Sequence, residues 1–289
     1  CSYCCSVNLH RTYKGKGTYV RFRSVDSVMD ELNEAKAKMK NLKVVHFWDE
    51  IFSDDENWID EFIERYKKEI GLPFEIWGHP LKVNKKLISK LVSVGLYKVV
   101  MGIQSGSPRV RKEIFHRVEK QEDIINASKV LTECKVPQVI YDFMLQHPFE
   151  SEEDIKQTYE LCTNLEPPFE LQLHGLNFLP GTDIVDMAVK QGVLSEEELE
   201  KIMYSPIQEQ YNMYWGYKND NAMSNFWYAL TFMTQFSLSR PLARYFAIRS
   251  NFPSKVKLAM KAYRLLKPLT KVRYYYKKAG ILIKSTIKF

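Results

Sequence analysis

Residues 98–107 read KVVMGIQSGS, an apolar run rich in β-branched residues that passes into a loop of Gln, Ser and Gly. Such a short run, bounded by polar residues, predicts a buried strand that ends near Gln104. The segment NKKLISKLVSVG (84–95) before it has helical periodicity and ends at a glycine, and SPRVRKEIFHRV (107–118) after it is also predicted to be helical. The stretch therefore predicts a helix–strand–helix unit.

The same alternation extends from Val25 to about Leu194. Further strands are predicted in residues 43–50, 74–80, 139–145 and 169–181, with amphipathic helices between them. Strands joined by helices of this length predict right-handed crossovers and a parallel sheet of about five βα units. The sequence thus predicts an α/β fold, built either as an open doubly wound sheet or as a barrel.

The alternation stops after about Glu196. We expect residues 1–195 to form the α/β core and residues 196–289 to form a helical, aromatic-rich and basic C-terminal region. From Arg240 onward the chain contains many Lys and Arg and no acidic side chain. This basic tail suggests an acidic partner surface, and a solvated helix face is the alternative.

Composition limits the class of protein. With 289 residues, 45% of them hydrophobic, the chain can fill a sizeable core. Its five cysteines are too few and too unevenly spread for a disulfide scaffold, and no apolar run reaches the ~18 residues of a membrane span. We therefore expect a globular protein of the reducing cytoplasm.

Three of the five cysteines lie in the first ten residues, CSYCCSVNLH. The C-x-x-C pair of Cys1 and Cys4 suits tetrahedral zinc, a redox disulfide or part of an iron–sulfur cluster. Zinc would need a second pair, but Cys134 and Cys162 are isolated, and no strand precedes the motif as it would in a thioredoxin. Cys5 directly follows Cys4, which orients it badly for the same cluster. Spacing alone leaves an iron–sulfur site and an incomplete site as alternatives.

Polar side chains follow the predicted strands. They are Asp49, Glu50, His79, Gln104, Ser105, Gln146, His147 and Asn177. Both candidate architectures bind ligands at the carboxyl ends of their strands, so this set predicts a site at one rim of the sheet. For any single member, a helix cap or a loop hydrogen bond is the alternative.

The N-terminal segment resembles the opening of radical SAM enzymes, whose signature is C-x-x-x-C-x-x-C with an aromatic residue before the last cysteine. Cys1 and Cys4, with Tyr3 between them, match the second and third cysteines. The first cysteine is then expected four residues upstream, and the chain is expected to be a fragment that begins inside its motif.

Further motifs resemble the cobalamin-binding radical SAM subgroup in the same order along the chain. They are RFRSVDSVMDE (21–31), HFWDEIF (46–52), GIQSGSPRV (102–110), YDFMLQHPFESEED (141–154) and NFLPGTDIVDMAVKQG (177–192), the last three similar to the fourth-, fifth- and sixth-strand motifs of the family. The fifth-strand segment departs from the pattern, with Gln146 and Phe149 in place of glycines and His147 in place of an apolar residue. The resemblance implies a partial (β/α)6 TIM-like barrel with a helical C-terminal module.

The resemblance also implies the cofactors. Cys1 and Cys4 would bind a [4Fe-4S] cluster, which cleaves S-adenosylmethionine reductively to methionine and a 5′-deoxyadenosyl radical. The residues implied to contact S-adenosylmethionine are Tyr3, Asp49, Glu50, Gln104, Ser105, Asp142 and Gln146. Tyr3 and the backbone of the fifth-strand segment, around Asp142 to Gln146, would lie near the adenine. The two acidic residues would accept from the ammonium group, and the Gln–Ser pair would reach the ribose or carboxylate.

The implied reaction is hydrogen abstraction from an unactivated carbon, followed by methyl transfer or rearrangement. A small-molecule substrate, a reductant such as flavodoxin or ferredoxin and, from the subgroup alone, cobalamin on a domain outside this chain would take part. With two of the three cluster cysteines, the chain itself is expected to be inactive. The alternatives are a methylthiotransferase acting on RNA or protein, which would carry a C-terminal β-barrel, a degenerate barrel that serves as a binding module, and a zinc-binding module.

Overall fold

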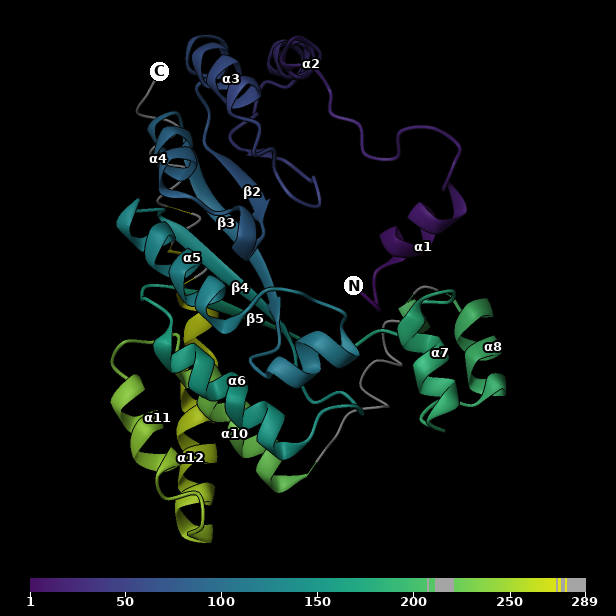
Figure 1. Cartoon of the computed structure of the whole chain (residues 1–289). Helices are drawn as coiled ribbons and strands as arrows, with labels where there is room; N and C mark the ends of the chain where they lie inside the picture. The colour runs from purple at the N-terminus through teal and green to yellow at the C-terminus, as the bar shows by residue number, and fades with distance from the viewer. Residues whose placement is uncertain (207, 211–220, 274, 277–278, 280–289) are drawn as a thin grey trace.

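A parallel five-stranded sheet forms the centre of the molecule in the computed structural model, which describes residues 1–206, 208–210, 221–273, 275–276 and 279 (Figure 1). The strands are β1 (Val45–His46), β2 (Phe74–Gly78), β3 (Leu96–Gln104), β4 (Gln138–Met144) and β5 (Glu170–His174). The helices up to the last strand are α1 (Cys5–Thr12), α2 (Val25–Lys38), α3 (Glu56–Glu69), η1 (Pro80–Lys82), α4 (Lys85–Ser93), η2 (Val110–Ile114), α5 (Gln121–Glu133) and α6 (Glu152–Asn164). After β5 follow α7 (Asp183–Lys190), α8 (Glu196–Tyr204), α10 (Ala222–Met233), α11 (Arg240–Ala247) and α12 (Pro253–Leu266).

The strand order decides between the two architectures that the sequence left open. The strands lie in chain order, β1-β2-β3-β4-β5, and all neighbours are parallel. A doubly wound sheet reverses its order at a switch point, whereas a barrel does not. The order is therefore that of a partial barrel, which confirms the predicted fold class.

Two predicted elements differ in detail. Residues 107–118, predicted to be helical, are helical at 108–114, where a first turn continues into the π-helix η2. Val110, Arg111, Ile114 and Phe115 are buried while Arg109, Lys112 and Glu113 are exposed, which is the one-sided burial of an amphipathic helix. The strand predicted in residues 169–181 ends at His174, and the residues after it continue without strand pairing to the turn before α7.

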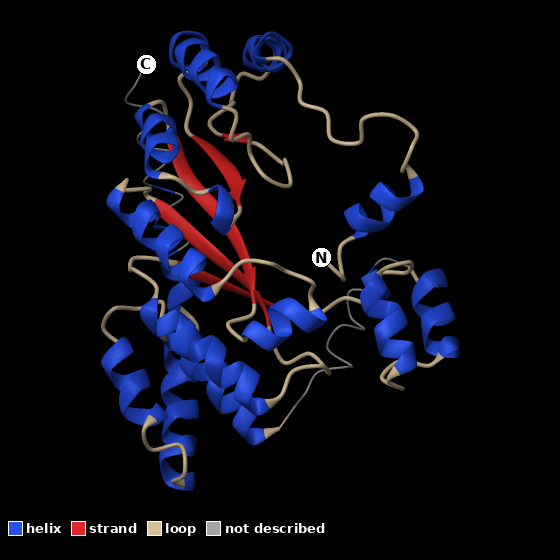
Figure 2. Ribbon diagram, in the orientation of Figure 1, coloured by secondary structure: helices blue, strands red, loops and turns tan. Residues whose placement is uncertain are grey.

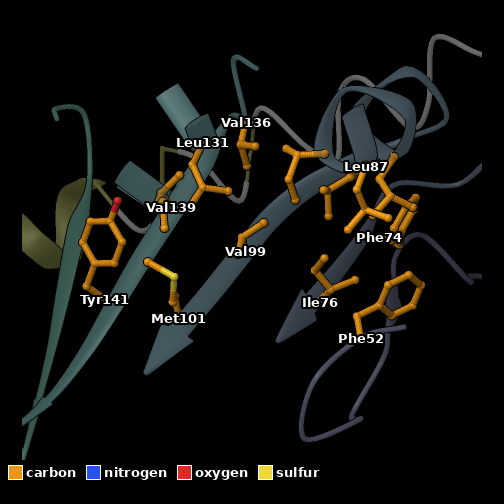
Figure 3. Close-up of a cluster of buried hydrophobic side chains, with 14 of the residues drawn as sticks. Phe52, Phe74, Ile76, Leu87, Val99, Met101, Leu131, Val136, Val139 and Tyr141 are labelled. Atoms are coloured by element: carbon orange, nitrogen blue, oxygen red, sulfur yellow. The ribbon is translucent and has the colours of Figure 1, made fainter. Parts of the chain in front are cut away.

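Helices cover one face of the sheet, where the main hydrophobic core lies (Figure 2). Figure 3 shows how alternate strand residues, such as Val99 and Met101 of β3 and Tyr141 of β4, contribute to this core together with Leu131 of α5. The residues between them along the strands face the other way, because side chains alternate along a strand. That other face, here called the polar side, carries charged residues such as Lys98 and Asp142 beside apolar ones such as Val100 and Ile140.

The C-terminal helices form a second packing unit against the sheet's outer helices. Helices α10, α11 and α12 share a core with Ile155 and Tyr159 of α6, in the lower part of Figure 1. Helix α8 instead packs on α7, since Ile202 lies in one cluster with Ile184 and Val185. The domain boundary after residue 195 stays a prediction. None of the helices in the described ranges has the length and apolar character needed to cross a membrane.

Candidate functional site

The cysteine turn is fixed to the barrel through Ser2. This buried residue donates its N–H to the carbonyl of Phe115 (3.0 Å) and accepts from the N–H of Ile184 (3.0 Å), while its hydroxyl donates to the Ile114 carbonyl. The N–H of Cys4 donates a hydrogen bond to the Cys1 carbonyl (3.3 Å), which closes the turn, and Cys4 is the N-cap residue of α1. Figure 1 shows the N-terminus between α7 and the end of the sheet toward which the strand arrows point. The half-buried Cys1 and Cys4 thus lie beside the carboxyl ends of the strands. Their role as metal ligands stays a prediction.

A buried guanidinium lies beside the first cysteine. Nη1 of Arg117 is 3.7 Å from Sγ of Cys1, and Nη2 donates to the carbonyl of Gly102 (2.8 Å). The third nitrogen, Nε, donates to the carboxylate of Glu119, whose side chain is fully buried. Nε2 of His79 lies 3.7 Å from the other oxygen of this carboxylate, and burial lowers the pKa of His79. Arg117 thus places a positive charge beside Sγ of Cys1, where it would attract an anionic group bound at the cysteine turn.

An aromatic series connects the cysteine turn with the end of β4. The ring of Tyr3 meets Phe115 edge-on at 5.0 Å, and Phe115 lies 5.1 Å from the ring of His147. Burial raises the pKa of Tyr3 to about 12, against the opposing charge of Arg117. Both nitrogens of His147 are buried without a hydrogen-bond partner among the described residues, and burial lowers its pKa to about 3. This series is an apolar wall beside the turn, containing a neutral imidazole.

Two glutamines at neighbouring strand ends have left-handed backbones. Gln104, the last residue of β3, has φ +70°, and Gln146, just after β4, has φ +60°. The side chain of Gln104 folds over Gly102, where an added Cβ would lie 2.4 Å from its Nε2. The backbone N–H of Gln146 donates to Oε2 of Glu150 (2.6 Å), and its side-chain Nε2 donates to Oδ1 of Asn225 in α10 (2.8 Å). Residues other than glycine in this conformation cost about 1–3 kcal/mol and are concentrated at functional sites.

The remaining predicted contacts have different surroundings. Asp49 and Glu50 lie exposed in the loop after β1, where Glu50 accepts from the hydroxyl of Ser6 in α1. Ser105 is fully buried, and its hydroxyl accepts from the N–H of Ser107 (3.1 Å) within the β3–η2 turn. Asp142 faces the polar side of the sheet, with Oδ1 3.8 Å from Nε2 of His174. The side chain of Asp142 raises the pKa of His174.

These positions allow a test of fit for the implied cofactors. Cys1 and Cys4 fit as two thiolate ligands of a cluster, beside a guanidinium suited to an anionic group. Within the described residues, no three His, Cys, Asp or Glu side chains converge as a metal site, so the structure assigns no third ligand. The roles proposed for the other predicted residues stay predictions.

Arg117 and Glu119 were not identified from the sequence. They lie two residues apart in FHRVEK, a segment between two helical patterns, where a solvated surface is the default expectation for charged side chains. The signal that could have indicated them is their position just after the GIQSGSPRV motif, because a link that follows a strand end can turn back toward the rim.

Comparison with known proteins decides the family. The sequence profile of the radical SAM superfamily matches residues 1–162, more than half of the chain. The chain belongs to the radical SAM superfamily. This confirms the resemblance drawn from the motifs, and it identifies the chain with a class of enzymes.

Relatives within the superfamily are methyltransferases and cobalamin-dependent enzymes. The chain is 25% identical over 139 residues to cytidylyl-2-hydroxyethylphosphonate methyltransferase of Streptomyces wedmorensis, a match that covers 45% of this chain and 24% of that enzyme. The fold is similar to that of the cobalamin-dependent S-adenosylmethionine radical enzyme OxsB with aqua-cobalamin bound, with a TM-score of 0.56, 11% identity, and coverage of 89% of this chain and 51% of that one. It is also similar to the radical S-adenosylmethionine methyltransferase TsrM from Kitasatospora setae with tryptophan and a SAM analog bound (TM-score 0.51, 17% identity, 58% of this chain and 33% of that one). The chain therefore spans about a quarter of the curated relative's length.

Proposed function

We propose that the protein is a radical S-adenosylmethionine methyltransferase that acts at an unactivated carbon of a small molecule. The observation that carries the proposal is the cysteine turn at the carboxyl rim of a parallel barrel, with a buried guanidinium 3.7 Å from Sγ of Cys1. The methyltransferases among the relatives support methyl transfer over rearrangement. A β-barrel, expected for a methylthiotransferase, is not found among residues 221–273, which contain helices.

The residues of the chain would have distinct tasks. Cys1 and Cys4 would hold a [4Fe-4S] cluster, which supplies the electron that cleaves S-adenosylmethionine to a 5′-deoxyadenosyl radical. Arg117, fixed by Glu119 and a β3 carbonyl, would attract the carboxylate of S-adenosylmethionine. The wall of Tyr3, Phe115 and His147 would exclude water from the reacting groups.

Other partners belong to the same proposal. Cobalamin, which OxsB binds, would be carried by a part of the protein outside this chain. A small reductant such as flavodoxin or ferredoxin would supply electrons, in the reducing cytoplasm where thiols stay unpaired.

The test is the anaerobic reconstitution of the protein, expressed from its natural coding region, with iron and sulfide. We expect a [4Fe-4S] signal in electron paramagnetic resonance after dithionite, and release of 5′-deoxyadenosine from S-adenosylmethionine. The adjacent cysteines provide a matched pair of variants: Cys4→Ala should abolish both signals, whereas Cys5→Ala, which removes an exposed thiol, should retain them.

The outcomes separate the alternatives. Loss of both signals in Cys4→Ala alone supports the proposal, and methyl transfer to candidate substrates becomes the next measurement. A cluster that forms without cleavage of S-adenosylmethionine would favour a degenerate barrel. Stoichiometric zinc in place of iron would overturn the assignment of the cysteine turn.

A further inference from the structure

Positive charge is concentrated at the C-terminal end of the chain. The residues from Arg240 to Phe289 include 14 Lys and Arg and no Asp or Glu, whereas the whole chain has a net charge of +7. The residues before Arg240 therefore carry a net negative charge. Among the described residues, the basic side chains lie on α11, on α12 and on the helical residues 269–273, which we call the basic lobe.

Apolar side chains are exposed along one side of α12. Leu258 and Leu265 lie seven positions apart on α12, the repeat of a single helix face. Beyond the end of α12 and a turn at residues 267–268, Leu269 and Val272 lie on the helical residues 269–273. All four are exposed, Leu265 to 79%. The opposite side, which includes Ala259, packs into the core shared with α10. The outward apolar face of α12 is thus not required to hold the lobe to the barrel.

Helix α11 has a similar outward side. Leu242 and Tyr245 of α11 are exposed. Leu238, in the turn before the helix, and Ile248, its C-cap residue, flank them and are 97% and 80% exposed. Ala243 and Phe246, between them in sequence, are buried in the core. Two adjacent helices therefore both present aliphatic side chains to the outside.

Basic side chains border these apolar residues. Lys257, Lys261 and Arg264 are exposed next to Leu258 and Leu265 on α12. Around Tyr245 of α11, the guanidinium of Arg249, just beyond the helix, lies 4.0 Å from the ring centroid, and Nζ of Lys255 of α12 lies 5.7 Å from it. Aliphatic side chains bordered by long cationic ones are the pattern of helices that lie in the interface of a lipid bilayer.

We propose that the basic lobe binds the surface of an anionic lipid bilayer, with its leucines and isoleucine between the lipid chains and its Lys and Arg at the level of the phosphates. The charge is complementary to anionic headgroups, which attract basic residues near a membrane surface. Exposed leucines favour lipid over nucleic acid, because single-stranded nucleic acids are bound by stacking on aromatic rings. The helices lie on the membrane rather than in it, since no described helix can cross one.

The test is flotation of the full-length protein with vesicles of phosphatidylcholine alone and with vesicles that also contain phosphatidylglycerol. We expect binding to the anionic vesicles only, weakened by high salt. Lys257→Gln with Lys261→Gln should weaken binding about 30-fold, the effect of removing two charges near an anionic surface. Leu265→Gln should weaken it about tenfold by removing an apolar contact with the lipid chains.

Matched controls come from other exposed helices. The pair Lys67→Gln with Lys129→Gln removes the same charge from α3 and α5, and Leu81→Gln removes an exposed leucine from η1. These variants should bind like the wild type. Equal loss in the controls, or equal binding to neutral vesicles, would overturn the proposal. The proposal would also be overturned if the protein bound no vesicles but bound RNA or associated with itself, and if Leu265→Gln abolished that binding. The basic lobe would then serve RNA or a second copy of the chain.

Discussion

Arg117 and Glu119 form an ion pair that is almost completely shielded from water, with side-chain exposures of 7% and 0%. Replacing Arg117 by Gln would leave the carboxylate of Glu119 buried without its charged partner. We expect the free energy of unfolding to fall by about 3–5 kcal/mol, measured by urea denaturation.

The double variant tests the cause of this loss. In Arg117→Gln with Glu119→Gln, no unpaired charge is buried, so a substantial part of the lost stability should return. Strict additivity of the two single losses would show that the pair is not coupled.

Asp154 gives the fold a specific dependence on pH. Burial acts to raise its pKa, but hydrogen bonds from Arg109, Ser107 and Ser151 outweigh burial and lower the pKa below the ordinary value. Asp154 therefore stabilises the fold fully above the unfolded-state pKa of about 3.9, and this contribution is lost as pH falls through the lower folded-state pKa. Asp154→Asn should destabilise the protein at neutral pH and much less at acidic pH.

The measurement is urea unfolding of wild type and Asp154→Asn at neutral pH and at a series of pH values below the unfolded-state pKa of about 3.9. The difference between the two proteins should shrink step by step as pH falls toward the folded-state pKa. A loss of stability that is equal at all pH values would contradict the argument. Asp60→Asn is the control, because Asp60 is exposed in its pair with Lys90 and such pairs contribute little.

The local parts of the site were predictable from single residues, and the convergent parts were not. Cys1, Tyr3 and Cys4 lie within four residues, so the motif was visible in the sequence. Its spacing left an iron–sulfur site and an incomplete site open, and the resemblance to radical SAM enzymes favoured the first. Arg117 reaches Cys1 across 116 positions of sequence, and that approach depends on how η2 packs, which spacing does not reveal. The left-handed backbone of Gln104 was equally hidden, because glutamine has no preference for positive φ.

Gly106 determines how closely the β3–η2 turn can approach α6. A Cβ on Gly106 would lie 2.3 Å from Cα of Thr158 and 2.7 Å from the carbonyl oxygen of Gln157, so the backbone itself would have to move. The N–H of Gly106 also donates to the hydroxyl of Thr158 (2.8 Å). We expect Gly106→Ala to lower the free energy of unfolding by at least about 3 kcal/mol in urea denaturation.

Gly192, after α7, is the matched control. It has φ +67° but nothing within 4 Å of an added Cβ, so Gly192→Ala should cost only the backbone term of about 1 kcal/mol. Similar losses of stability in Gly106→Ala and Gly192→Ala would mean that close contact with α6 does not explain the glycine at position 106.

Hydrophobic periodicity predicted where the strands and helices lie, but it did not predict the residues at which they begin and end. The apolar run around Val45 correctly predicted a strand, but only Val45 and His46 pair with β2. The reason is that periodicity indicates which residues can be buried, whereas strand length is set by the hydrogen bonds that a neighbouring strand offers. At the same scale, the buried Arg111 donates to the Ser105 carbonyl (2.8 Å) and joins the π-helical residues of η2 to the end of β3, a local widening of the helix that periodicity does not reveal.

Arg240 joins the C-terminal helices to the barrel. Its Nη2 donates to the carbonyls of Cys162 (3.0 Å) and Leu165 (2.8 Å) at the end of α6, and its Nε donates to the carbonyl of Thr234 (2.8 Å). Arg240→Met keeps the aliphatic stem and removes these donors. We expect a loss of about 2–3 kcal/mol in the free energy of unfolding, since these are hydrogen bonds from a charged donor.

Arg244→Met is the control on the same helix, where Arg244 is exposed. It should change stability by no more than about 0.5 kcal/mol. Limited proteolysis adds a second readout, because Arg240→Met alone should make α11 and α12 more accessible to cleavage. Unchanged proteolysis and stability in Arg240→Met would show that apolar packing alone holds the helices in place.

The position of Ser2 also bears on the order in which the protein is made. Its backbone bonds join residues 2, 115 and 184, so the cysteine turn cannot reach its final place before Ile184 has left the ribosome. At translation rates of 5–20 residues per second, that is roughly 10–40 s after Ser2 is synthesised. Until then the thiols belong to a nascent chain whose barrel is unfinished. Iron delivery during synthesis would therefore meet unorganised cysteines, and stable loading belongs to the period after the barrel has closed around residue 184.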